Sequence, residues 1–194
     1  MKKILISMIA FAMMLSPACD KIKDATSRDI KVNNIKFDFK AKTEDVAARS
    51  GELSAVEPRA GATTSFTVER LVNLSELGSA EVLEYANKIN KVVVNNALIN
   101  VTANPTGNYT LTNLTFKADG VTVDGANSLV VPSYTMGSAF TAPSNMLNYM
   151  SAFIMRLVAV GSVKVTVSGQ SDAPAGTELT IRIEGDAILT ASLL

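Results

Sequence analysis

The sequence predicts a mainly β protein, a β-sandwich with two short amphipathic helices. Short runs rich in β-branched residues recur along the chain, with turn signals every ten or so positions, as in sandwiches of two antiparallel sheets. Two other segments repeat apolar residues at helical spacing. Without its first 18 residues the chain keeps 176, enough for one domain with its own core. We therefore expect a single β-sandwich-like domain over residues 29–194.

The first expected strand lies at residues 35–41, where the side chains alternate in polarity. Ile35, Phe37, Phe39 and Ala41 alternate there with Lys36, Asp38, Lys40 and Lys42. Such alternation is typical of a strand with one buried face. Further strands are expected at 66–72, 92–103, 109–118, 121–123, 129–134, 160–168 and 179–184. The pairs Asp119-Gly120 and Asp124-Gly125 are hairpin-type turns.

Two helices are expected to cover the apolar surface of the sheets. In residues 79–91 the apolar positions form one helical stripe, made of Val82, Leu83, Ala86, Ile89 and Val93. The second stripe consists of Met146, Leu147, Met150, Phe153, Ile154, Leu157 and Val158. Pro143 precedes it, and Ser144 is the candidate N-cap.

A weak internal repeat suggests an alternative α+β architecture. The two helical segments align at an offset of 64 residues, so that Val82 matches Met146 and Tyr85 matches Tyr149. The segments that follow them also align. Residues 65–128 and 129–192 would then be two strand, helix, strand, strand copies related by a pseudo-twofold axis.

The N-terminus has the three parts of a secretory signal. Met1-Lys2-Lys3 is a short cationic start, residues 4–15 are apolar, and Ser16-Pro17-Ala18-Cys19 follows. As a helix, the apolar run would be about 18 Å long, well short of the roughly 30 Å that a membrane-spanning helix must cross. We therefore expect residues 1–18 to be a signal peptide.

The segment Leu15-Ser16-Pro17-Ala18-Cys19 resembles the lipobox of bacterial lipoproteins, in the looser form of the Bacteroidota. This resemblance covers about the first twenty residues. It implies lipidation of Cys19, with palmitate among its acyl chains, and a lasting tether to the outer membrane. Residues 19–28 would be the lipidated cysteine and a polar spacer. Ser16 and Ala18 also satisfy the cleavage rule of an ordinary secretory signal, which would instead release a soluble domain.

The use of cysteine favours the lipoprotein over the soluble domain. Cys19 is the only cysteine of the chain, so it has no partner for an intramolecular disulfide. A free exposed thiol in an oxidising compartment would be a liability.

The composition excludes several classes of function. The chain has no histidine and no cysteine after Cys19, which removes histidine-based acid/base catalysis, catalytic triads, cysteine nucleophiles and the usual zinc or iron ligand sets. Without Lys2 and Lys3, 16 basic residues face 18 acidic ones, so no basic surplus would attract nucleic acid. We expect no enzyme activity, cofactor or metal. An acid-based hydrolase would need two carboxylates facing each other in a cleft.

Three groups of residues are weighed as sites against plainer interpretations. Met136, Met146, Met150 and Met155 would suit a hydrophobic groove under the second helix, but core packing is the commoner role of such a stripe. Asp119 and Asp124 offer carboxylates to calcium, yet hairpin turns explain both. Tyr109 and Tyr134 could stack on sugars near strand ends. The absence of tryptophan argues against that platform.

Residues 43–63 are expected to form a long exposed loop. Arg49 or Arg59 in this loop could be a maturation cleavage site, as in fimbrial precursors, although an irregular loop is the simpler interpretation.

The sequence therefore predicts a lipid-anchored cell-envelope protein with a non-catalytic binding, scaffold or assembly role. Its expected partners are the membrane, through Cys19, and other envelope proteins, on either side of the outer membrane. One alternative is a fimbria-like or adhesin subunit that polymerises by strand exchange. Another is a small-ligand carrier or glycan-binding accessory, which would need a lined pocket or an aromatic platform.

Overall fold

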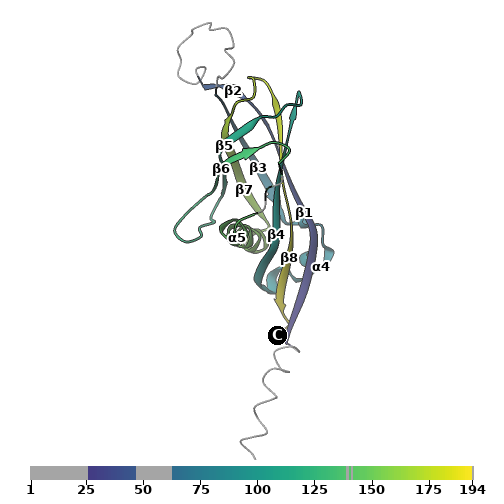
Figure 1. The fold of residues 1–194 in the computed structure, drawn as a ribbon. Coiled ribbons are helices and arrows are strands. Elements are labelled where there is room, and N and C mark those ends of the chain that lie inside the picture. The colour runs from purple at the N-terminus through teal and green to yellow at the C-terminus, as the bar shows by residue number, and fades with distance from the viewer. Residues whose placement is uncertain (1–25, 47–62, 139, 141, 194) are drawn as a thin grey trace, which may run out of the picture.

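Alternating burial along β1 (Ser27–Lys42) shows how the sequence builds the sandwich. Ile35, Phe37 and Phe39 are buried while Lys36 and Lys40 are exposed, as the polarity pattern predicts. The computed structural model describes residues 26–46, 63–138, 140 and 142–193. Within them, two antiparallel sheets pack face to face, which confirms the β-sandwich (Figure 1).

The two sheets have different sizes. The smaller has the strand order β1, β8 (Glu178–Ser192), β4 (Ile89–Asn104). The larger has the order β2 (Glu44–Asp45), β3 (Thr64–Asn73), β7 (Ser162–Ser171), β5 (Thr110–Ala118), β6 (Leu129–Thr135). Every neighbouring pair of strands is antiparallel.

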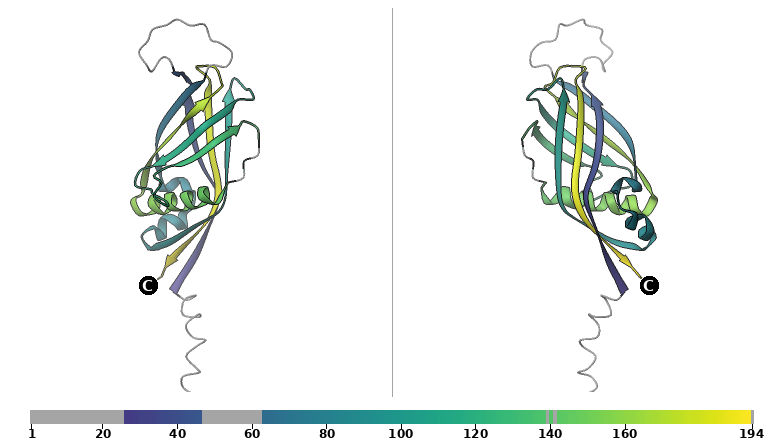
Figure 2. Two further views of the ribbon diagram at one scale, coloured as in Figure 1. Left: turned by 60° about the vertical axis from the view of Figure 1, so that its left-hand side comes forward. Right: turned by 90° about the vertical axis from the view of Figure 1, so that its right-hand side faces the viewer.

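The two sides of the sandwich are closed differently. On one side β1 packs directly against β3 and the 3-10 helix η1 (Leu74–Leu77). On the other side the helix α5 (Ser144–Val160) packs against the edge strand β4 and reaches β7 and β6 (Figure 2). The α5 side chain of Phe153 meets Phe37 of β1 edge to face, with ring centroids 5.4 Å apart. The helix is therefore part of the core.

One continuous apolar core joins both sheets and α5. Its largest fully buried side chains are Ile30, Phe37, Phe39, Phe66, Leu111, Leu114, Met146, Ile154, Leu157, Leu179, Ile181 and Leu189. Burying an aliphatic or aromatic side chain of this size contributes about 1.5–3 kcal/mol, so this set dominates stability.

The first helix ends earlier than the sequence pattern predicts. Helix α4 (Ala80–Tyr85) has Ser79 as N-cap, is followed by the 3-10 helix η2 (Ala86–Lys88), and β4 begins at Ile89. The prediction that the helix continues to Lys91 is wrong, because the β-branched residues from Ile89 onward pair with the end of β8.

Both ends of α5 also differ from the prediction. Pro143 occupies the N-cap position and Ser144 is the first helical residue, so Ser144 is not the cap. At the other end the helix includes Val160, which was expected to begin a strand. Gly161 then adopts a left-handed conformation and donates its N–H to the Leu157 carbonyl, and β7 starts at Ser162.

The ladder between β1 and β8 extends both strands beyond the expected limits. β1 begins at Ser27, so the predicted spacer to residue 28 is two residues too long, and β8 continues to Ser192 instead of ending at Glu184. Residues 121–123 form no strand. Val123 pairs only with Ala126, across a tight turn in which Asp124 and Gly125 both have positive φ.

Asp186 of β8 lies where both neighbouring strands carry bulges. The register shifts between Val32 and Ile35 in β1 and between Val94 and Asn96 in β4. The carboxylate of Asp186 accepts hydrogen bonds from the Asn34 N–H (2.9 Å) and from Asn96 Nδ2 (2.7 Å). The Asn34 N–H is a backbone group that the bulge of β1 leaves out of the ladder with β8.

The predicted repeat describes the order of elements but not their symmetry. The first expected copy corresponds to β3, α4, β4 and β5, and the second to β6, α5, β7 and β8. The pairing of β4 with β8 is then equivalent to the pairing of β7 with β5. A twofold axis would also have to pair β6 with β4, because β3 pairs with β7. Instead β6 pairs with β5, so the pseudo-twofold architecture is not formed.

In the part of the chain that the structure describes, no helix is both long and apolar enough to cross a membrane.

Candidate functional site

The outward face of the small sheet carries regular rows of mostly polar side chains. Its side chains form three rows across β1, β8 and β4. These rows are Lys36, Glu184 and Leu98, then Asp38, Arg182 and Asn100, then Lys40, Thr180 and Thr102. We call these nine residues the polar sheet face. They point outward because Phe37, Ile181 and Ile99, which alternate with them, fill the core.

An ion pair occupies the centre of the polar sheet face. Arg182 Nε lies 2.6 Å from Asp38 Oδ1 and Nη2 lies 2.9 Å from Oδ2, a two-point contact between β8 and β1. The hydrogen bonds and positive charge of Arg182 hold the pKa of Asp38 below its ordinary value, and Asp38 in turn raises the pKa of Arg182. Both groups are therefore charged at neutral pH. Glu184 Oε1 lies 3.7 Å from Arg182 Nη1.

A shallow hollow of about 70 Å³ lies beside this ion pair. Asn100, Thr102, Thr180 and Arg182 line it. The hollow offers amide, hydroxyl and guanidinium groups, all able to donate hydrogen bonds. It could accept a small polar group of a larger partner, but no carboxylate lines it.

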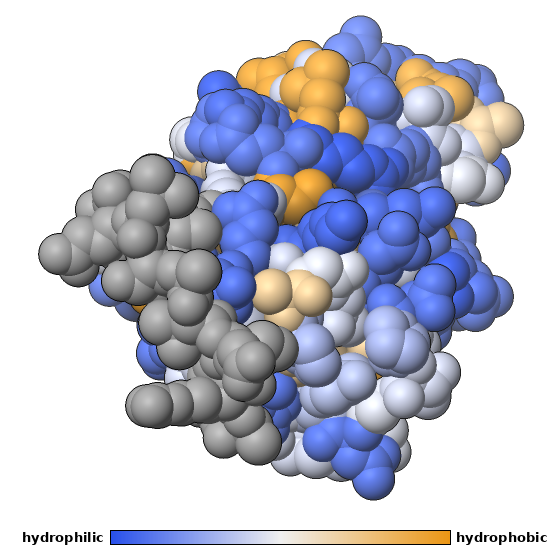
Figure 3. All heavy atoms as spheres, turned by 90° about the horizontal axis from the view of Figure 1, so that it is seen from above, coloured by the Kyte–Doolittle hydropathy of each residue, from blue (hydrophilic) through white to orange (hydrophobic). Residues whose placement is uncertain are grey.

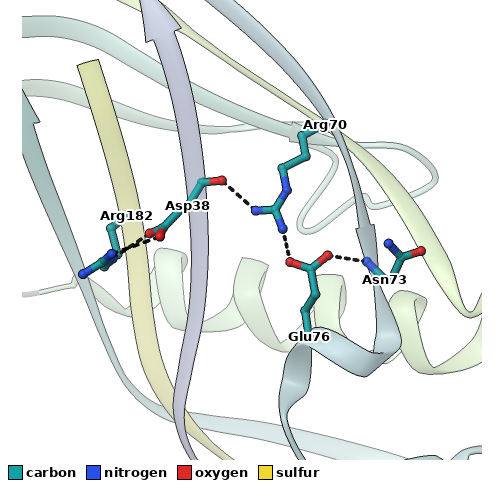
Figure 4. Close-up of polar contacts among 5 residues, drawn as sticks. All are labelled: Asp38, Arg70, Asn73, Glu76 and Arg182. Carbon is teal, nitrogen blue, oxygen red and sulfur yellow. Dashed lines mark hydrogen bonds and ion pairs between the residues drawn. The ribbon is translucent and has the colours of Figure 1, made fainter. Parts of the chain in front are cut away.

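A second polar network joins the edge of β1 to the large sheet (Figure 4). Arg70 of β3 donates to the main-chain carbonyl of Asp38 (2.6 Å) and pairs with Glu76 of η1. Glu76 in turn accepts from the Asn73 N–H at 2.9 Å, and the Arg70 guanidinium lies 5.7 Å from the centre of the Phe39 ring. Asp38 is thus held through its side chain by Arg182 and through its backbone by Arg70.

Three predicted sites fall outside the described residues. These are Cys19 with the signal peptide at 1–18, and the candidate cleavage sites Arg49 and Arg59. The chain that follows Cys19 is described from Thr26 onward, and β1 begins eight residues after Cys19. Ser27 pairs with Ser192, so the start of β1 and the end of β8 lie at one end of the sandwich, opposite β2 (Figure 1).

The four methionines serve the core instead of a ligand groove. Met136, Met146 and Met150 are buried, and Met155 is half-buried. Met150 also lines a small apolar cavity of about 20 Å³ between the sheets and α5, together with Phe37, Phe116 and Phe153. A cavity of this size holds roughly one water molecule, so it cannot accommodate an organic ligand.

The tyrosines do not form an aromatic platform. Tyr134 is buried and Tyr109 packs against the core at a strand end, so the stacking surface proposed for them is not formed. Tyr149 is also buried. Its hydroxyl accepts from the Ala118 N–H (2.9 Å) and lies 3.4 Å from the Asn127 carbonyl, and burial raises its pKa.

Within the part of the chain that the structure describes, the acidic side chains form no group that could hold a metal. Among the described residues no three Asp or Glu side chains are grouped to hold a metal, and Asp119 and Asp124 lie in separate turns. Several carboxylates instead meet cations. Glu69 lies 2.6 Å from Lys164, which lowers the pKa of Glu69, and Glu81 pairs with Arg28.

The polar sheet face is the site that sequence reasoning missed. The alternation of residues 35–42 placed Asp38 and Lys40 on an outward face. It could not show which strand pairs with this one. Asp38 and Arg182 are 144 residues apart, and only the register of β1 on β8 brings them together.

Comparisons with known proteins give no family. No protein-family model and no curated protein sequence matches the chain. Among solved structures, TmCBM61 in complex with beta-1,4-galactotriose is 11% identical, with 84% of this chain and 86% of that chain covered and a TM-score of 0.28. The Desmodium yellow mottle tymovirus chain is 12% identical, with coverages of 83% and 90% and a TM-score of 0.27. A Mud Crab Dicistrovirus chain is 9% identical, with coverages of 82% and 68% and a TM-score of 0.30. Scores this low support no functional conclusion.

Proposed function

We propose that the chain is a lipid-anchored envelope protein whose β-sandwich has a non-catalytic binding or scaffold role. The observation that carries the proposal is the short distance in sequence between Cys19 and the sandwich. β1 begins at Ser27, and from there it extends away along the full length of the small sheet. A lipid on Cys19 would therefore hold one end of the sandwich at the membrane.

This arrangement would present the polar sheet face away from the lipid. Its central row contains Asp38, which follows Ser27 by eleven residues along β1. At about 3.3 Å per residue, the row lies roughly 35 Å from the tethered end. A partner in the envelope could reach the face without contacting the membrane.

The anchor is tested by comparing the full chain with Cys19→Ala and Cys19→Ser in cells fed a labelled fatty acid. We expect label and membrane partition in the wild type and loss of both in the two variants. A wild-type chain without label, or variants that still partition with the membrane, would contradict the anchor. The substitutions lie eight residues before β1 in the sequence, so folding of the sandwich should be unchanged. Circular dichroism of each purified chain checks this.

The binding role is tested separately through the polar sheet face. Crosslinking in intact cells, followed by identification of neighbours, should give partners that are lost in Asn100→Arg and retained in Lys117→Ala, on the outward side of the large sheet. If both variants keep the crosslinked partners, the polar sheet face does not have the binding role. The anchor would be unaffected by that result.

A second candidate, a subunit that assembles by strand exchange, is favoured by the position of β1. This strand is at the edge of its sheet and buries Ile30, Val32, Phe37 and Phe39 in the core. A cut between residues 46 and 63 would leave β1 attached to the sandwich only by non-covalent contacts. Another copy could then replace it, as in β-strand addition.

The mass of the mature chain decides this second candidate. Strand exchange requires a mature chain that begins within residues 43–63. A mature chain that still contains β1 would exclude it.

A further inference from the structure

β4 has a long free edge in the described structure. It is the last strand of the small sheet and pairs only with β8. The lower part of its open side is covered by α5, where the Ser151 Oγ accepts a hydrogen bond from the Val94 N–H at 3.0 Å. Beyond the bulge at Asn96, no hydrogen bond between described residues reaches the open side of residues 97–104.

The free backbone groups belong to residues whose side chains face the core. Side-chain face and N–H direction alternate together along a strand, and Val94, a buried residue, directs its N–H away from β8. By the same relation, the backbone groups of Ala97, Ile99, Val101 and Ala103 point to the open side of β4. These residues alternate with the exposed Leu98, Asn100 and Thr102. In the described structure, four regularly spaced residues between 97 and 103 thus have backbone groups without a partner strand.

The other sheet edges carry features that oppose pairing between copies. β1 is covered by β3 and η1, and its outward Lys36 and Lys40 flank Asp38, so pairing around Asp38 would place like charges opposite each other. β6 contains Pro132, which lacks an N–H, and β2 has only two residues.

The free edge of β4 has none of these features. The sequence contains no charged residue from 92 to 116, and the first proline after β4 begins is Pro105, beyond its end. Leu98, in the middle of the edge, is 51% exposed. Seen from the β2 end, the exposed hydrophobic residues of the molecule lie in separate groups among polar ones (Figure 3).

We propose that two copies of the chain pair antiparallel through the free edges of β4, around a twofold axis at Asn100. The free groups are symmetric about this residue. Ile99 would pair with Val101 of the second copy, and Ala97 with its Ala103, so that every free group finds a partner. Side by side on the outward face, Asn100 would meet Asn100 and Leu98 would meet Thr102. The small sheets would join into one sheet of six strands.

Cysteine crosslinking tests the pairing in the full chain purified in detergent. Residues facing each other across a non-hydrogen-bonded pair have Cβ atoms about 4.5–5.5 Å apart, near the range of a disulfide. Asn100→Cys should therefore form a disulfide-linked dimer under mild oxidation. Lys40→Cys lies on the same face but on β1, and it should remain unlinked. The unaltered chain controls for Cys19.

The association itself is measured by sedimentation across a range of concentrations. Asn100→Lys would place two ammonium groups opposite each other and should raise the dimer dissociation constant about fivefold or more. Thr180→Lys adds the same charge one strand further from the edge and should leave the constant unchanged. A chain that stays monomeric throughout, an unlinked Asn100→Cys, or equal dissociation constants for the two lysine variants would each overturn the proposal.

Discussion

Arg182 and Asp38 join β8 to β1 through a two-point ion pair, although 144 residues separate them in sequence. The pair lies on the outward face, between strands whose inward side chains form the core. Arg70 holds the Asp38 carbonyl from the other side. Asp38 therefore links both sheets at the edge where β1 closes the sandwich.

The stability contributed by Asp38 should depend on pH. Its pKa is lowered in the folded protein, chiefly by the hydrogen bonds from Arg182, relative to the ordinary value of 3.8. A lowered pKa contributes stability that is complete above the unfolded value and is lost as the pH falls through the folded value. Asp38→Asn should therefore destabilise the protein at pH 7, and the difference should shrink below pH 3.8.

Urea unfolding of Asp38→Asn, Arg182→Gln and the double variant measures this coupling. In the Arg182→Gln background, Asp38→Asn should have a smaller effect at pH 7. Equal effects in both backgrounds would mean that the pair is not coupled.

Asp186 should determine the geometry at the bulges of the small sheet. Hydrogen bonds from the Asn34 N–H and from Asn96 lower its pKa. Asp186→Asn replaces one carboxylate oxygen with an amide group, so the side chain cannot accept from the Asn34 N–H and from Asn96 Nδ2 at once. We expect lower stability and faster amide hydrogen exchange at Asn34. Asp124→Asn, in an exposed turn, is the matched control and should leave exchange at Asn34 unchanged.

Removal of the Tyr149 hydroxyl should leave a buried backbone donor without its partner. The Ala118 N–H donates to this hydroxyl at 2.9 Å, and an unsatisfied buried donor costs about 1–3 kcal/mol. Tyr149→Phe should reduce the free energy of unfolding by that amount. Tyr85→Phe, at a half-buried tyrosine whose ring contacts Arg28, should change it little. Similar losses in both variants would contradict the role of the hydroxyl.

Ser151 should protect the lower part of the β4 edge. Its hydroxyl accepts from Val94 and donates to the Leu147 carbonyl at 2.8 Å. Ser151→Ala should therefore cost about 1 kcal/mol and speed hydrogen exchange at Val94. Ser144→Ala on the same helix should be neutral, because Ser144 is exposed and is not the N-cap. Unchanged exchange at Val94 in Ser151→Ala would show that this bond does not protect the edge.

Local patterns were sufficient for the type of most elements but not for their ends. Alternation predicted β1, and the apolar stripe predicted α5 with nearly its observed length. The failures lie at Ile89 and Val160, where an apolar residue suits either of two elements, and at Glu184, where the strand was expected to end. At Ile89 pairing with β8 decided the outcome, and at Val160 the left-handed Gly161 did. The extension of β8 past Glu184 follows from its ladders with β1 and β4, which are contacts distant in sequence.

The sequence by itself determined the fold class, the core faces of the strands and the absence of histidine chemistry, because composition and periodicity are properties of the chain alone. It also predicts the anchor at Cys19, through a motif that needs no tertiary structure. Only the tertiary structure decided that Asp38 meets Arg182, that the methionines and Tyr134 are core, and that β4 is left with a free edge. These features depend on which strands become neighbours and in what register. That choice is made by packing across the whole sandwich, which no local pattern records.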